Sequence, residues 1–478
     1  MPSIQLSEAI DAPIFKTLSR AAEALQLETY VVGGFVRDFL LDRDQKSDID
    51  IVCIGSGIEL AEKTAQLLPG KIGVSVFKNF GTAMLKFGDL KIEFVGARRE
   101  SYRPNSRKPI VEAGNLRVDQ NRRDFTINTL AIGLHRANHG LLVDPFNGLG
   151  DLKKRLIRTP LDPDITYSDD PLRMLRAIRL AAQLGFSIER ESFQALSKNK
   201  ARIAIVSMER IADEFNQIML SEKPSHGLLL LEKSGLLPYI LPELQALKGI
   251  DERDGQTHKD NFYHTLEVVD NISPNTVDLW LRWAALLHDI GKAPTKKFDK
   301  KIGWTFHGHE YIGGKMVSKI FRRLKLPLGK PVKYVRKLVT LSSRPIALVD
   351  DKATDSAIRR LLFDADSDIE DLMMLCDADI TTKNKKRYEQ YKSNFERVRQ
   401  RLKAVERRDH IRNWQPPIDG KAIMSAFNLH PGREIGIIKT AIREAILEGE
   451  IPNEYRAAYD FMLKKGADMG LKPVVRFH

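Results

Sequence analysis

The sequence predicts an α+β fold, in which a small mixed-sheet head is followed by a chain that is almost entirely helical. Five short runs rich in β-branched and apolar residues lie before residue 97, and an amphipathic helical segment precedes them. After the turn-rich segment Asp144–Gly148, apolar residues instead recur with the 3.6-residue period of helices. The chain of 478 residues is long enough for about three or four domains or subdomains.

The predicted elements follow one another in a simple order. The predicted strands cover 29–34, 48–55, 71–77, 82–87 and 91–96. A segment rich in charge, proline and asparagine follows at 97–121, and we expect a mobile loop there. The clearest predicted helices cover 171–186, 208–220, 281–292, 317–324 and 435–449. With further loops at 249–260 and 413–417, we expect four domains: a head at 1–145, a helical neck at 146–248, a helical body at 249–405 and a helical tail at 406–478.

The composition favours a polyanionic partner in a reducing compartment. Lysine and arginine outnumber aspartate and glutamate by 76 to 63, which gives a formal net charge of +13 and fits RNA. No apolar run is long enough to span a bilayer, so we expect no membrane segment. The N-terminus lacks the features of a secretory signal. The two cysteines, Cys53 and Cys376, have no CxxC partner, which argues for the cytoplasm and against structural zinc.

The run VVGGFVRDFLLDRDQKSDIDIV contains two features of a phosphate-binding metal site. Asp48 and Asp50 are two residues apart on a predicted strand, so both carboxylates point to the same face, with Cα atoms about 7 Å apart. Such a pair can hold one or two Mg²⁺ ions, which proteins usually bind through carboxylates and substrate phosphates. The glycine pair Gly33–Gly34 lets backbone N–H groups approach a triphosphate. The alternative is a hairpin with two solvated aspartates.

The motif GGFVRDFLL followed by SDIDIV resembles the active-site signature of the DNA polymerase β nucleotidyltransferase superfamily. More narrowly, it resembles the tRNA nucleotidyltransferases, or CCA-adding enzymes, and the bacterial poly(A) polymerases. NRRDFTINTLAIG is similar to the family motif RRDFTxNA, although Thr129 replaces the common alanine. The resemblance implies that residues of these motifs contact the nucleotide sugar and phosphates, namely Gly33, Gly34, Arg37, Arg123 and Asp124. Glu93 is either a third catalytic carboxylate on a neighbouring strand or an ordinary surface residue.

The segment SDDPLRMLRAIRLAAQLGF resembles the motif EDxxR of the bacterial and eukaryotic type of CCA-adding enzyme, with Asp169 in place of glutamate. The resemblance implies that Asp170 and Arg173 read the base. A carboxylate accepts from the exocyclic amine that C and A share, and a guanidinium donates to the adjacent ring acceptor. Arg173, Arg176 and Arg179 lie three apart on one helix face, where they can meet phosphates or stack on bases. The alternative is a capped amphipathic helix with solvated arginines.

A second metal signature lies in the body. His264, the pair His288–Asp289 and Asp379 resemble the ligand set of the HD superfamily of metal-dependent phosphohydrolases. Histidine and aspartate together suit a divalent transition metal or Mg²⁺, and a bound metal lowers the pKa of water for attack on a phosphoester. Nearby polar residues of lower rank are His307, His309 and Asp377. The alternative is a body that keeps the HD fold without using it.

The tail segment 418–455 resembles the tail of the same tRNA enzymes, and its GREIG loop opens a helix whose N–H groups can meet an RNA phosphate. We therefore expect an enzyme that adds C, C and A to tRNA 3′ ends from CTP and ATP, with Mg²⁺ in the head and a divalent metal in the body. The alternatives are a poly(A) polymerase, a CC-only or A-only enzyme, or an HD phosphohydrolase whose head binds RNA.

Overall fold

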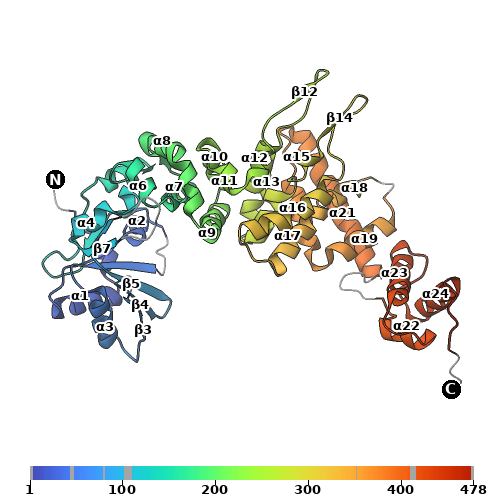
Figure 1. The fold of residues 1–478 in the computed structure, drawn as a ribbon, viewed down its shortest axis with the longest axis horizontal. Helices are drawn as coiled ribbons and strands as arrows, with labels where there is room; N and C mark the ends of the chain where they lie inside the picture. Colours follow the sequence, from blue (N-terminus) through green and yellow to red (C-terminus); the bar gives the residue numbers. More distant parts are fainter. Residues whose placement is uncertain are drawn as a thin grey trace. The chain divides into compact units, whose positions relative to one another are not determined.

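The computed structural model describes residues 4–43, 48–78, 81–101, 110–350, 353–409 and 416–474 (Figure 1). Contacts between Cα atoms divide the chain into two compact units, Met1–Pro242 and Glu243–His478. The first unit contains the sheet and the helices that follow it, and the second contains the remaining helices. The predicted α+β class, with a small mixed-sheet head and a helical remainder, is confirmed.

The head is built on a seven-stranded mixed sheet with the strand order β3-β4-β5-β2-β1-β8-β9. β2 and β5 run parallel, and every other neighbouring pair in this sheet runs antiparallel. All five predicted strands are present. The strands of the sheet are β1 (Thr29–Val32), β2 (Asp48–Cys53), β3 (Val74–Phe77), β4 (Thr82–Phe87), β5 (Leu90–Gly96), β8 (Ala131–Gly133) and β9 (Leu142–Val143).

Alternation along the strands separates the core of the head from its exposed face. On β2, Ile49 and Ile51 are buried whereas the two aspartates between and before them are exposed. Phe94 on β5 is also fully buried. Helix α1 (Pro13–Ala24) packs on α3 (Gly57–Leu67), and α3 packs on β4 and β5 (Figure 1). One face of the sheet is therefore buried in the core of the head, and polar residues of β2 and β5 lie on the other face.

The prediction of a mobile loop over 97–121 is wrong for its described part. Strand β6 (Arg98–Ser101) pairs antiparallel with β7 (Ile110–Ala113), and helix α4 (Leu116–Asn121) follows. The side chain of Asn115 accepts a hydrogen bond from the backbone N–H of Val118, so it caps the N-terminus of α4. The charged residues of this segment favour a loop in a prediction from sequence, so neither the helix cap nor the short strands were predicted. Residues 102–109 lie outside the described part of the chain.

The rest of the first unit is helical, as predicted. Its two longest predicted helices are present as α7 (Leu172–Leu184) and α9 (Met208–Met219), which pack against each other through buried apolar residues. The other helices of this unit are α2 (Gly34–Leu40), α5 (Gly148–Lys153), α6 (Pro163–Asp169), α8 (Arg190–Asn199), α10 (Pro224–Lys233) and α11 (Leu237–Ile240). The two-residue strands β10 (Leu156–Ile157) and β11 (Ser187–Ile188) pair parallel across the neck.

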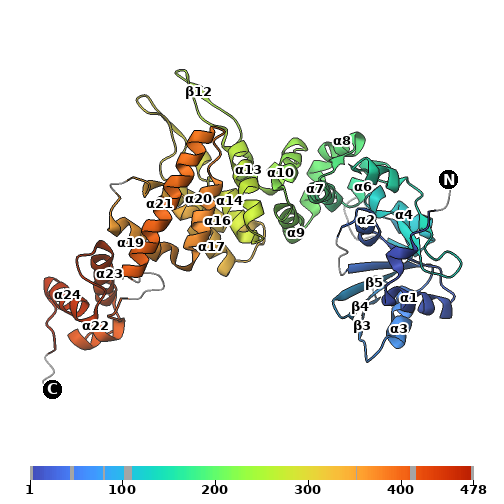
Figure 2. The same cartoon turned by 180° about the vertical axis from the view of Figure 1, so that it is seen from behind.

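The second unit contains a helical body and a helical tail. The body helices are α12 (Pro242–Gln245), α13 (Asn261–Ile272), α14 (Leu279–Leu287), α15 (Lys292–Thr295), α16 (His309–Arg323), α17 (Lys330–Leu341), α18 (Arg344–Ala347), α19 (Asp355–Ala365), α20 (Ile369–Ala378) and α21 (Lys385–Asp409). Helix α21 contacts both α19 and α20, as Figure 2 shows. The tail helices are α22 (Gly420–Phe427), α23 (Arg433–Glu448) and α24 (Tyr455–Asp468). The predicted linker at 413–417 falls mostly outside the described residues.

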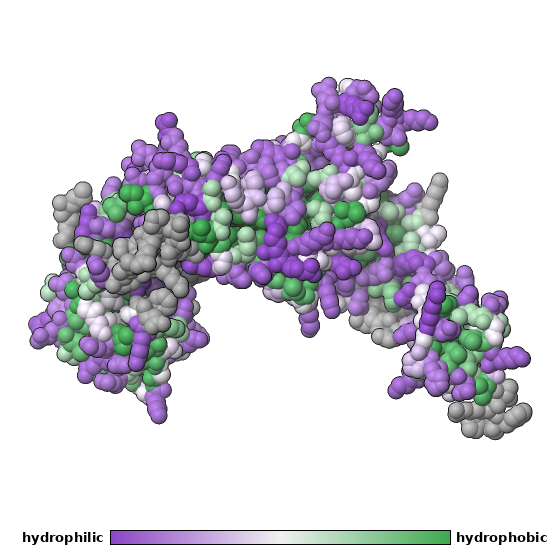
Figure 3. All heavy atoms as spheres, in the orientation of Figure 1, coloured by the Kyte–Doolittle hydropathy of each residue, from purple (hydrophilic) through white to green (hydrophobic). Residues whose placement is uncertain are grey.

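Two hairpins that the sequence did not predict project from the body (Figure 1). They are formed by β12 (Glu252–Arg253) with β13 (Gln256–Thr257), and by β14 (Lys297–Asp299) with β15 (Gly303–Thr305). Their visible surface in Figure 3 is mostly hydrophilic. Short 3₁₀ helices cover Ser7–Ile10, Thr126–Asn128, Lys200–Ile205, Ser273–Asn275 and Asp366–Asp368. Among the described helices, none is both long enough and apolar enough to cross a membrane.

Candidate functional site

The three predicted catalytic carboxylates lie together on the exposed face of the head sheet. Asp48 and Asp50 are on β2, and Glu93 is on the parallel neighbour β5, directly in register with Asp50. All three are exposed, whereas the residues that alternate with them are buried. The prediction that Glu93 is on a neighbouring strand is confirmed. We call Asp48, Asp50 and Glu93, together with Gly33 and Arg123, the head site.

Gly33 leaves room for the carboxylate and the guanidinium of this site. It has a φ of 77°, which favours glycine, and it precedes the first residue of α2. A Cβ atom at this position would lie 3.2 Å from Oδ2 of Asp50 and 3.5 Å from Nη1 of Arg123. A Cβ at Gly34 would lie 3.5 Å from Nη2 of Arg37. The glycine pair therefore lies against the residues that the sequence predicts to bind a nucleotide.

The electrostatics of the head site favour a bound cation. Although the Asp50 side chain reaches solvent, the protein around it partly desolvates the carboxyl and, with the charge of Asp48, raises its pKa; Arg123 opposes this shift. Burial and the charge of Asp50 likewise raise the pKa of Glu93. Carboxylates whose negative charges repel each other are stabilised by a divalent cation between them. The donor set, made of oxygen atoms alone, fits Mg²⁺.

A buried polar network joins α2 of the head to α7 of the neck. Arg37 forms an ion pair with Asp38 and donates through Nη1 to Oδ1 of Asn128 at 2.9 Å. Asn128 donates through Nδ2 to Asp124 at 3.0 Å. Arg176 on α7 then donates to Oδ2 of Asp124 from Nε at 2.8 Å and from Nη2 at 2.6 Å. Burial alone would raise the pKa of the Asp124 carboxyl, but Arg176 and Asn128 hold it well below its usual range.

The other predicted neck residues are also engaged within the protein. Arg173 donates through Nη2 to the backbone carbonyl of Arg122 at 2.7 Å. Oδ1 of Asp170 accepts from the backbone N–H of Leu172 at 3.2 Å, near the start of α7. Arg179 pairs with Glu214 on α9, at 2.5 Å between Nε and Oε2. Arg173 thus lies beside the segment that carries Arg123 and Asp124, whereas Arg179 faces the neighbouring helix.

The predicted metal ligands of the body converge from three helices, and we call them the body site. His264 is on α13, His288 and Asp289 follow α14, and Asp379 follows α20. Nε2 of His264 lies 2.8 Å from Oδ1 of Asp379, and Nε2 of His288 lies 3.6 Å from the same atom. Oδ2 of Asp289 lies 3.3 Å from Nε2 of His288. The carboxyl ends of α14 and α20 meet here, which adds negative potential.

The contacts around His288 are those expected of a histidine that binds a metal. Its Nδ1 lies 2.7 Å from the backbone carbonyl of Ala285, and the N–H that this atom carries fixes the ring and leaves Nε2 as the ligand atom. Within the part of the chain that the structure describes, Nε2 has no hydrogen-bond partner although it is buried. Burial lowers the pKa of His288, but the Asp289 and Asp379 carboxylates outweigh that effect and raise it. A cation at this position would replace the proton.

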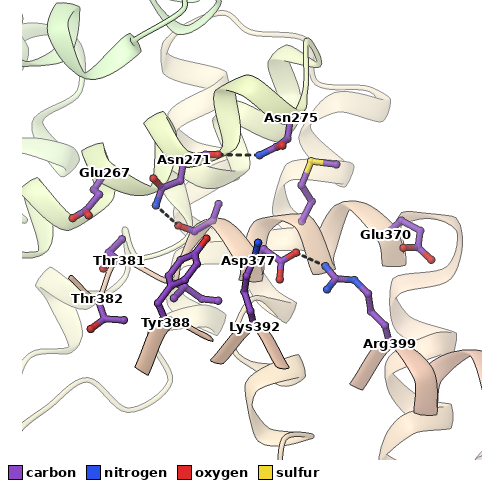
Figure 4. A pocket seen from close by; sticks show the side chains of 13 residues that line it. Glu267, Asn271, Asn275, Glu370, Asp377, Thr381, Thr382, Tyr388, Lys392 and Arg399 are labelled. Atoms are coloured by element: carbon purple, nitrogen blue, oxygen red, sulfur yellow. Dashed lines mark hydrogen bonds and ion pairs between the residues drawn. The ribbon is translucent and has the colours of Figure 1, made fainter. Parts of the chain in front are cut away.

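Four further residues contact the predicted residues of the two sites. From the sequence, His309 has a low rank, and Lys259, Asp119 and Asn128 are not predicted. In the body site, His309 lies 3.4 Å from Asp289, and Lys259 contacts Nδ1 of His264 at 2.8 Å. In the head, buried Asp119 pairs with Arg122 and Arg123, and Asn128 bridges Arg37 to Asp124. The i, i+4 spacing of Asp119 and Arg123 in the sequence is the pattern that could have indicated this pair, although Arg123 lies just beyond the end of α4. Asp377, another low-ranked candidate, instead pairs with Arg399 (Figure 4).

Comparison with known proteins places the chain among nucleotidyltransferases. Residues 29–158 match the Poly A polymerase head domain, residues 185–248 match a probable RNA and SrmB-binding site of polymerase A, and residues 261–383 match the HD domain. A structure of the CCA-adding enzyme from Bacillus stearothermophilus in complex with CTP has a TM-score of 0.66 at 22% identity, and covers 96% of this chain and 99% of that chain. This likeness shows a shared fold.

Two relatives define the family more narrowly. The chain is 34% identical over 359 residues to the A-adding tRNA nucleotidyltransferase of Deinococcus radiodurans, across 72% of this chain and 78% of that protein. It is 30% identical to the CC-adding tRNA nucleotidyltransferase of Thermus thermophilus, across 90% of this chain and 92% of that protein. The chain therefore belongs to the tRNA nucleotidyltransferase family, and the resemblance found in its motifs is confirmed. It is an enzyme, and nucleotidyltransferases of this type use divalent metals.

The Asp124–Arg176 pair generates a prediction about stability. Asp124→Asn should lower the free energy of unfolding at pH 7 by about 2 kcal/mol, less than for a fully buried pair, because the Arg176 side chain keeps 37% of its surface exposed. The folded-state pKa of Asp124 is depressed, so its contribution is complete above the unfolded-state pKa of about 3.9 and is lost as the pH falls below it. Chemical denaturation at several values between pH 7 and pH 3 measures both effects.

The control for this prediction is Asp164→Asn, which removes the exposed Asp164–Lys198 pair in the same unit. This variant should unfold almost like the wild type, since exposed ion pairs contribute little. A loss for Asp124→Asn that is no larger than the control, or that does not shrink towards pH 3, would contradict the structural role of the pair.

Proposed function

We propose that this enzyme completes the CCA sequence at tRNA 3′ ends, using CTP and ATP and no nucleic-acid template. The observation that carries the proposal is the head site, where Asp50 lies in register with Glu93 and beside Gly33 and Arg123. The net charge of +13 supports binding of a polyanion such as tRNA. Two relatives named A-adding and CC-adding tRNA nucleotidyltransferases support the choice of RNA.

In the proposed reaction, the terminal 3′ hydroxyl of tRNA attacks the α-phosphate of the nucleotide, a new phosphodiester bond forms, and pyrophosphate leaves. Asp48 and Asp50 would hold the Mg²⁺ ions. When bound, these ions would activate the hydroxyl and neutralise the charge of the leaving pyrophosphate. Glu93 would complete the ligand set or accept the hydroxyl proton. Arg123 would pair with a phosphate at the position that Gly33 keeps open.

Asp170 and Arg173 are the residues that we propose to select the base. Their roles rest on the motif SDDPLRMLR at the start of α7. In the structure, Arg173 donates to the backbone carbonyl of Arg122, beside Arg123. A second role is therefore open to Arg173, in which it positions the segment that binds phosphates. The two roles differ in their effect on the four nucleoside triphosphates. Arg176 and Arg179 would support Asp170 and Arg173 indirectly, because their ion pairs with Asp124 and Glu214 hold α7 in place.

We propose the four domains given above: a catalytic head at 1–145, a nucleotide-selecting neck at 146–248, a body at 249–405 and a tRNA-binding tail at 406–478. The division of contacts after Pro242 supports a boundary between neck and body. We also place the protein in the cytoplasm. Its two cysteines, Cys53 and Cys376, are both buried and free, which suits a reducing compartment.

A second proposed function is hydrolysis of phosphoesters by the body. The observation that favours it is the buried Nε2 of His288, which lies 3.3 Å from Asp289 and 3.6 Å from Asp379, in a cluster with His264. A divalent metal held by these ligands supplies Lewis-acid chemistry for attack of water on phosphorus. The P–O bond to the alcohol then breaks, and a phosphomonoester yields an alcohol and inorganic phosphate. Lys292, whose Nζ lies 2.6 Å from Asp289, orients that carboxylate.

Extension of three tRNAs tests the first function. Purified enzyme should incorporate labelled CTP into tRNAs that end before the first and before the second C, and labelled ATP into a tRNA that ends in CC. Activity on the last substrate alone would make the enzyme A-adding, and activity on the first two alone would make it CC-adding. Long A tracts without C addition would favour a poly(A) polymerase.

The head site predicts a loss of chemistry without a loss of binding. Asp50→Asn should reduce nucleotide incorporation by at least about 1,000-fold, because one carboxylate of the metal pair is replaced by a neutral amide. Affinity for tRNA should change less than about threefold, because it is distributed over many basic groups. Rapid-quench incorporation and filter binding measure the two effects. Near-normal incorporation by this variant would refute the assignment.

Arg173→Ala separates the two roles of Arg173. If Arg173 reads the base, kcat/KM should fall for CTP and ATP, and discrimination against UTP and GTP should relax by about 10- to 100-fold, since each charge-assisted hydrogen bond contributes about 1.5–3 kcal/mol. Every triphosphate carries the same phosphates, so a purely positional role should lower all four values equally. Steady-state kinetics with the four triphosphates on one tRNA decide between them, with Arg173→Lys as the charge-retaining control.

The body site predicts an independent activity. His288→Ala should abolish metal-dependent hydrolysis of phosphomonoesters and 2′,3′-cyclic phosphates, whereas Asp50→Asn should keep it, because the two ligand sets lie in separate compact units. Hydrolysis is measured by phosphate release with Mg²⁺, Mn²⁺, Ni²⁺ or Co²⁺. A wild-type enzyme that hydrolyses none of these substrates with any of these metals would show that the body does not catalyse this reaction.

A further inference from the structure

Two lysines lie on the same face of the head sheet as the proposed catalytic carboxylates. In the register of the sheet, Lys91 on β5 pairs with Asp48 just as Glu93 pairs with Asp50. Residues that pair directly across neighbouring strands point to the same face, and so do residues two apart on one strand. Lys86 on β4, the outer neighbour of β5, pairs in turn with Lys91 (Figure 2). The carboxylates are therefore continued on one side by a short row of positive charge.

The surroundings of Lys91 favour a ligand that brings negative charge. Its Nζ lies 3.9 Å from Oδ1 of Asp48, and 47% of its side chain remains exposed. Lys86 is also exposed, and it forms no ion pair with any residue that the structure describes. Like charges that face each other directly on two strands destabilise a sheet. An anion bound beside the two ammonium groups would remove that repulsion.

The sheet separates the two substrates of the head site around Asp50. Gly33 follows Val32, the residue of β1 that pairs with Asp50, and it lies beside Arg123. Glu93 lies on the opposite side of Asp50, on β5. In phosphoryl transfer, the attacking and the leaving oxygens lie roughly in line on opposite sides of the phosphorus. If the triphosphate binds at Gly33 and Arg123, the attacking 3′ hydroxyl therefore approaches from the side of β5.

We propose that Lys91 binds the last internucleotide phosphate of the tRNA primer and thereby positions the primer's 3′ hydroxyl. A single sugar separates that phosphate from the hydroxyl, and Lys91 is two positions from Glu93, about 7 Å along β5. Lys86 extends the same positive edge toward the preceding phosphate. The inference rests on the proposed polymerising function of the head. It names a residue for the RNA primer, whereas the head-site residues serve the metal and the nucleotide.

The contact between Lys91 and Asp48 offers a second explanation for any loss of activity, because removing Lys91 could act through the metal ligand. The two explanations differ, since only a contact with RNA depends on the charge of the RNA phosphate. Lys16 supplies a matched control. It is exposed and lies 3.0 Å from Asp11, but it belongs to α1, which packs on α3 and so lies on the side of the core face.

The first experiment removes the charge from either partner. The primer is whichever of the three tRNAs above the wild type extends, prepared once in natural form and once with a neutral methylphosphonate at its last internucleotide linkage. On the natural tRNA, Lys91→Ala should lower kcat/KM for tRNA by about 10- to 100-fold, the range for one charge-assisted contact. KM for the nucleotide should change less than about twofold, because its phosphates bind elsewhere.

The methylphosphonate should lower kcat/KM of the wild type by a similar factor, but that of Lys91→Ala by less than about twofold, because the contact is already lost. Lys16→Ala should behave like the wild type with both tRNAs, and Lys91→Arg should restore most of the activity on the natural tRNA. Thermal melting shows that each variant is folded. If the methylphosphonate affects Lys91→Ala as strongly as the wild type, the two changes are independent and the phosphate contact is refuted.

The second experiment requires neither metal nor turnover. Periodate-oxidised tRNA carries a 2′,3′-dialdehyde at its end, and an aldehyde condenses with a nearby lysine amine to an imine with loss of water. Cyanoborohydride then donates hydride and reduces the imine to a stable secondary amine. With the full-length enzyme in EDTA, peptide sequencing should locate the label at Lys91 and not at Lys16. Absence of label at Lys91 would contradict its place beside the primer end.

The outcomes separate this inference from the function on which it rests. A wild type that extends tRNA, but shows no coupling between Lys91 and the phosphate or no label at Lys91, refutes the primer contact alone. A wild type that extends none of the three tRNAs refutes the proposed function. The label then decides by itself whether Lys91 meets the end of the RNA.

Discussion

The arrangement of the head and neck depends on one buried carboxylate, that of Asp124. A buried negative charge is unfavourable unless hydrogen bonds and a cation compensate it, and Asp124 receives both, from Asn128 and from Arg176. Asn128 is held in turn by Arg37 from α2, whereas Arg176 is carried by α7. The pair therefore holds the neck helix against the loop that also carries Arg123, so the residues that we propose to bind and to select the nucleotide are joined by the same contacts.

In the body, too, neighbouring groups stabilise buried charged residues, but here the residues are the histidines and aspartates of the body site. His288, Asp289 and Asp379 lie where α14 and α20 end, so the two helix dipoles and the carboxylates together produce a negative potential that favours a cation. His288 is held by a backbone carbonyl through one nitrogen and presents the other inward. Hydrogen bonds to Asp289 and His264 come from residues outside the ligand set, Lys292 and Lys259. In both sites, neighbouring residues orient the side chains that we propose to be functional.

Much of this organisation could be predicted from the sequence, because it follows from local patterns. Alternation in DIDIV identified β2 and its exposed aspartates, and the resemblance of the segments around His264, His288 and Asp379 to the HD ligand set identified the body cluster. The contacts that hold these residues could not be predicted in this way. The bond from Arg173 to the carbonyl of Arg122 joins positions distant in the sequence, and a backbone acceptor leaves no signal in the residue types. The sequence predicts a loop over 97–121 because the short strands and the helix cap of this charged segment are specified by few residues.

The parallel pairing of β2 with β5 has a consequence for how the head folds. Parallel neighbours cannot be joined by a tight turn, and here residues 54–89, with α3 and the strands β3 and β4, must form the connection. Asp50 and Glu93 are therefore paired only through this whole crossover, and long-range pairings of this kind slow folding. The pairing of β2 with β5 thus holds two mutually repelling acids side by side. A head in which β2 and β5 are not paired therefore lacks the proposed head site, because Asp50 and Glu93 are then not held side by side.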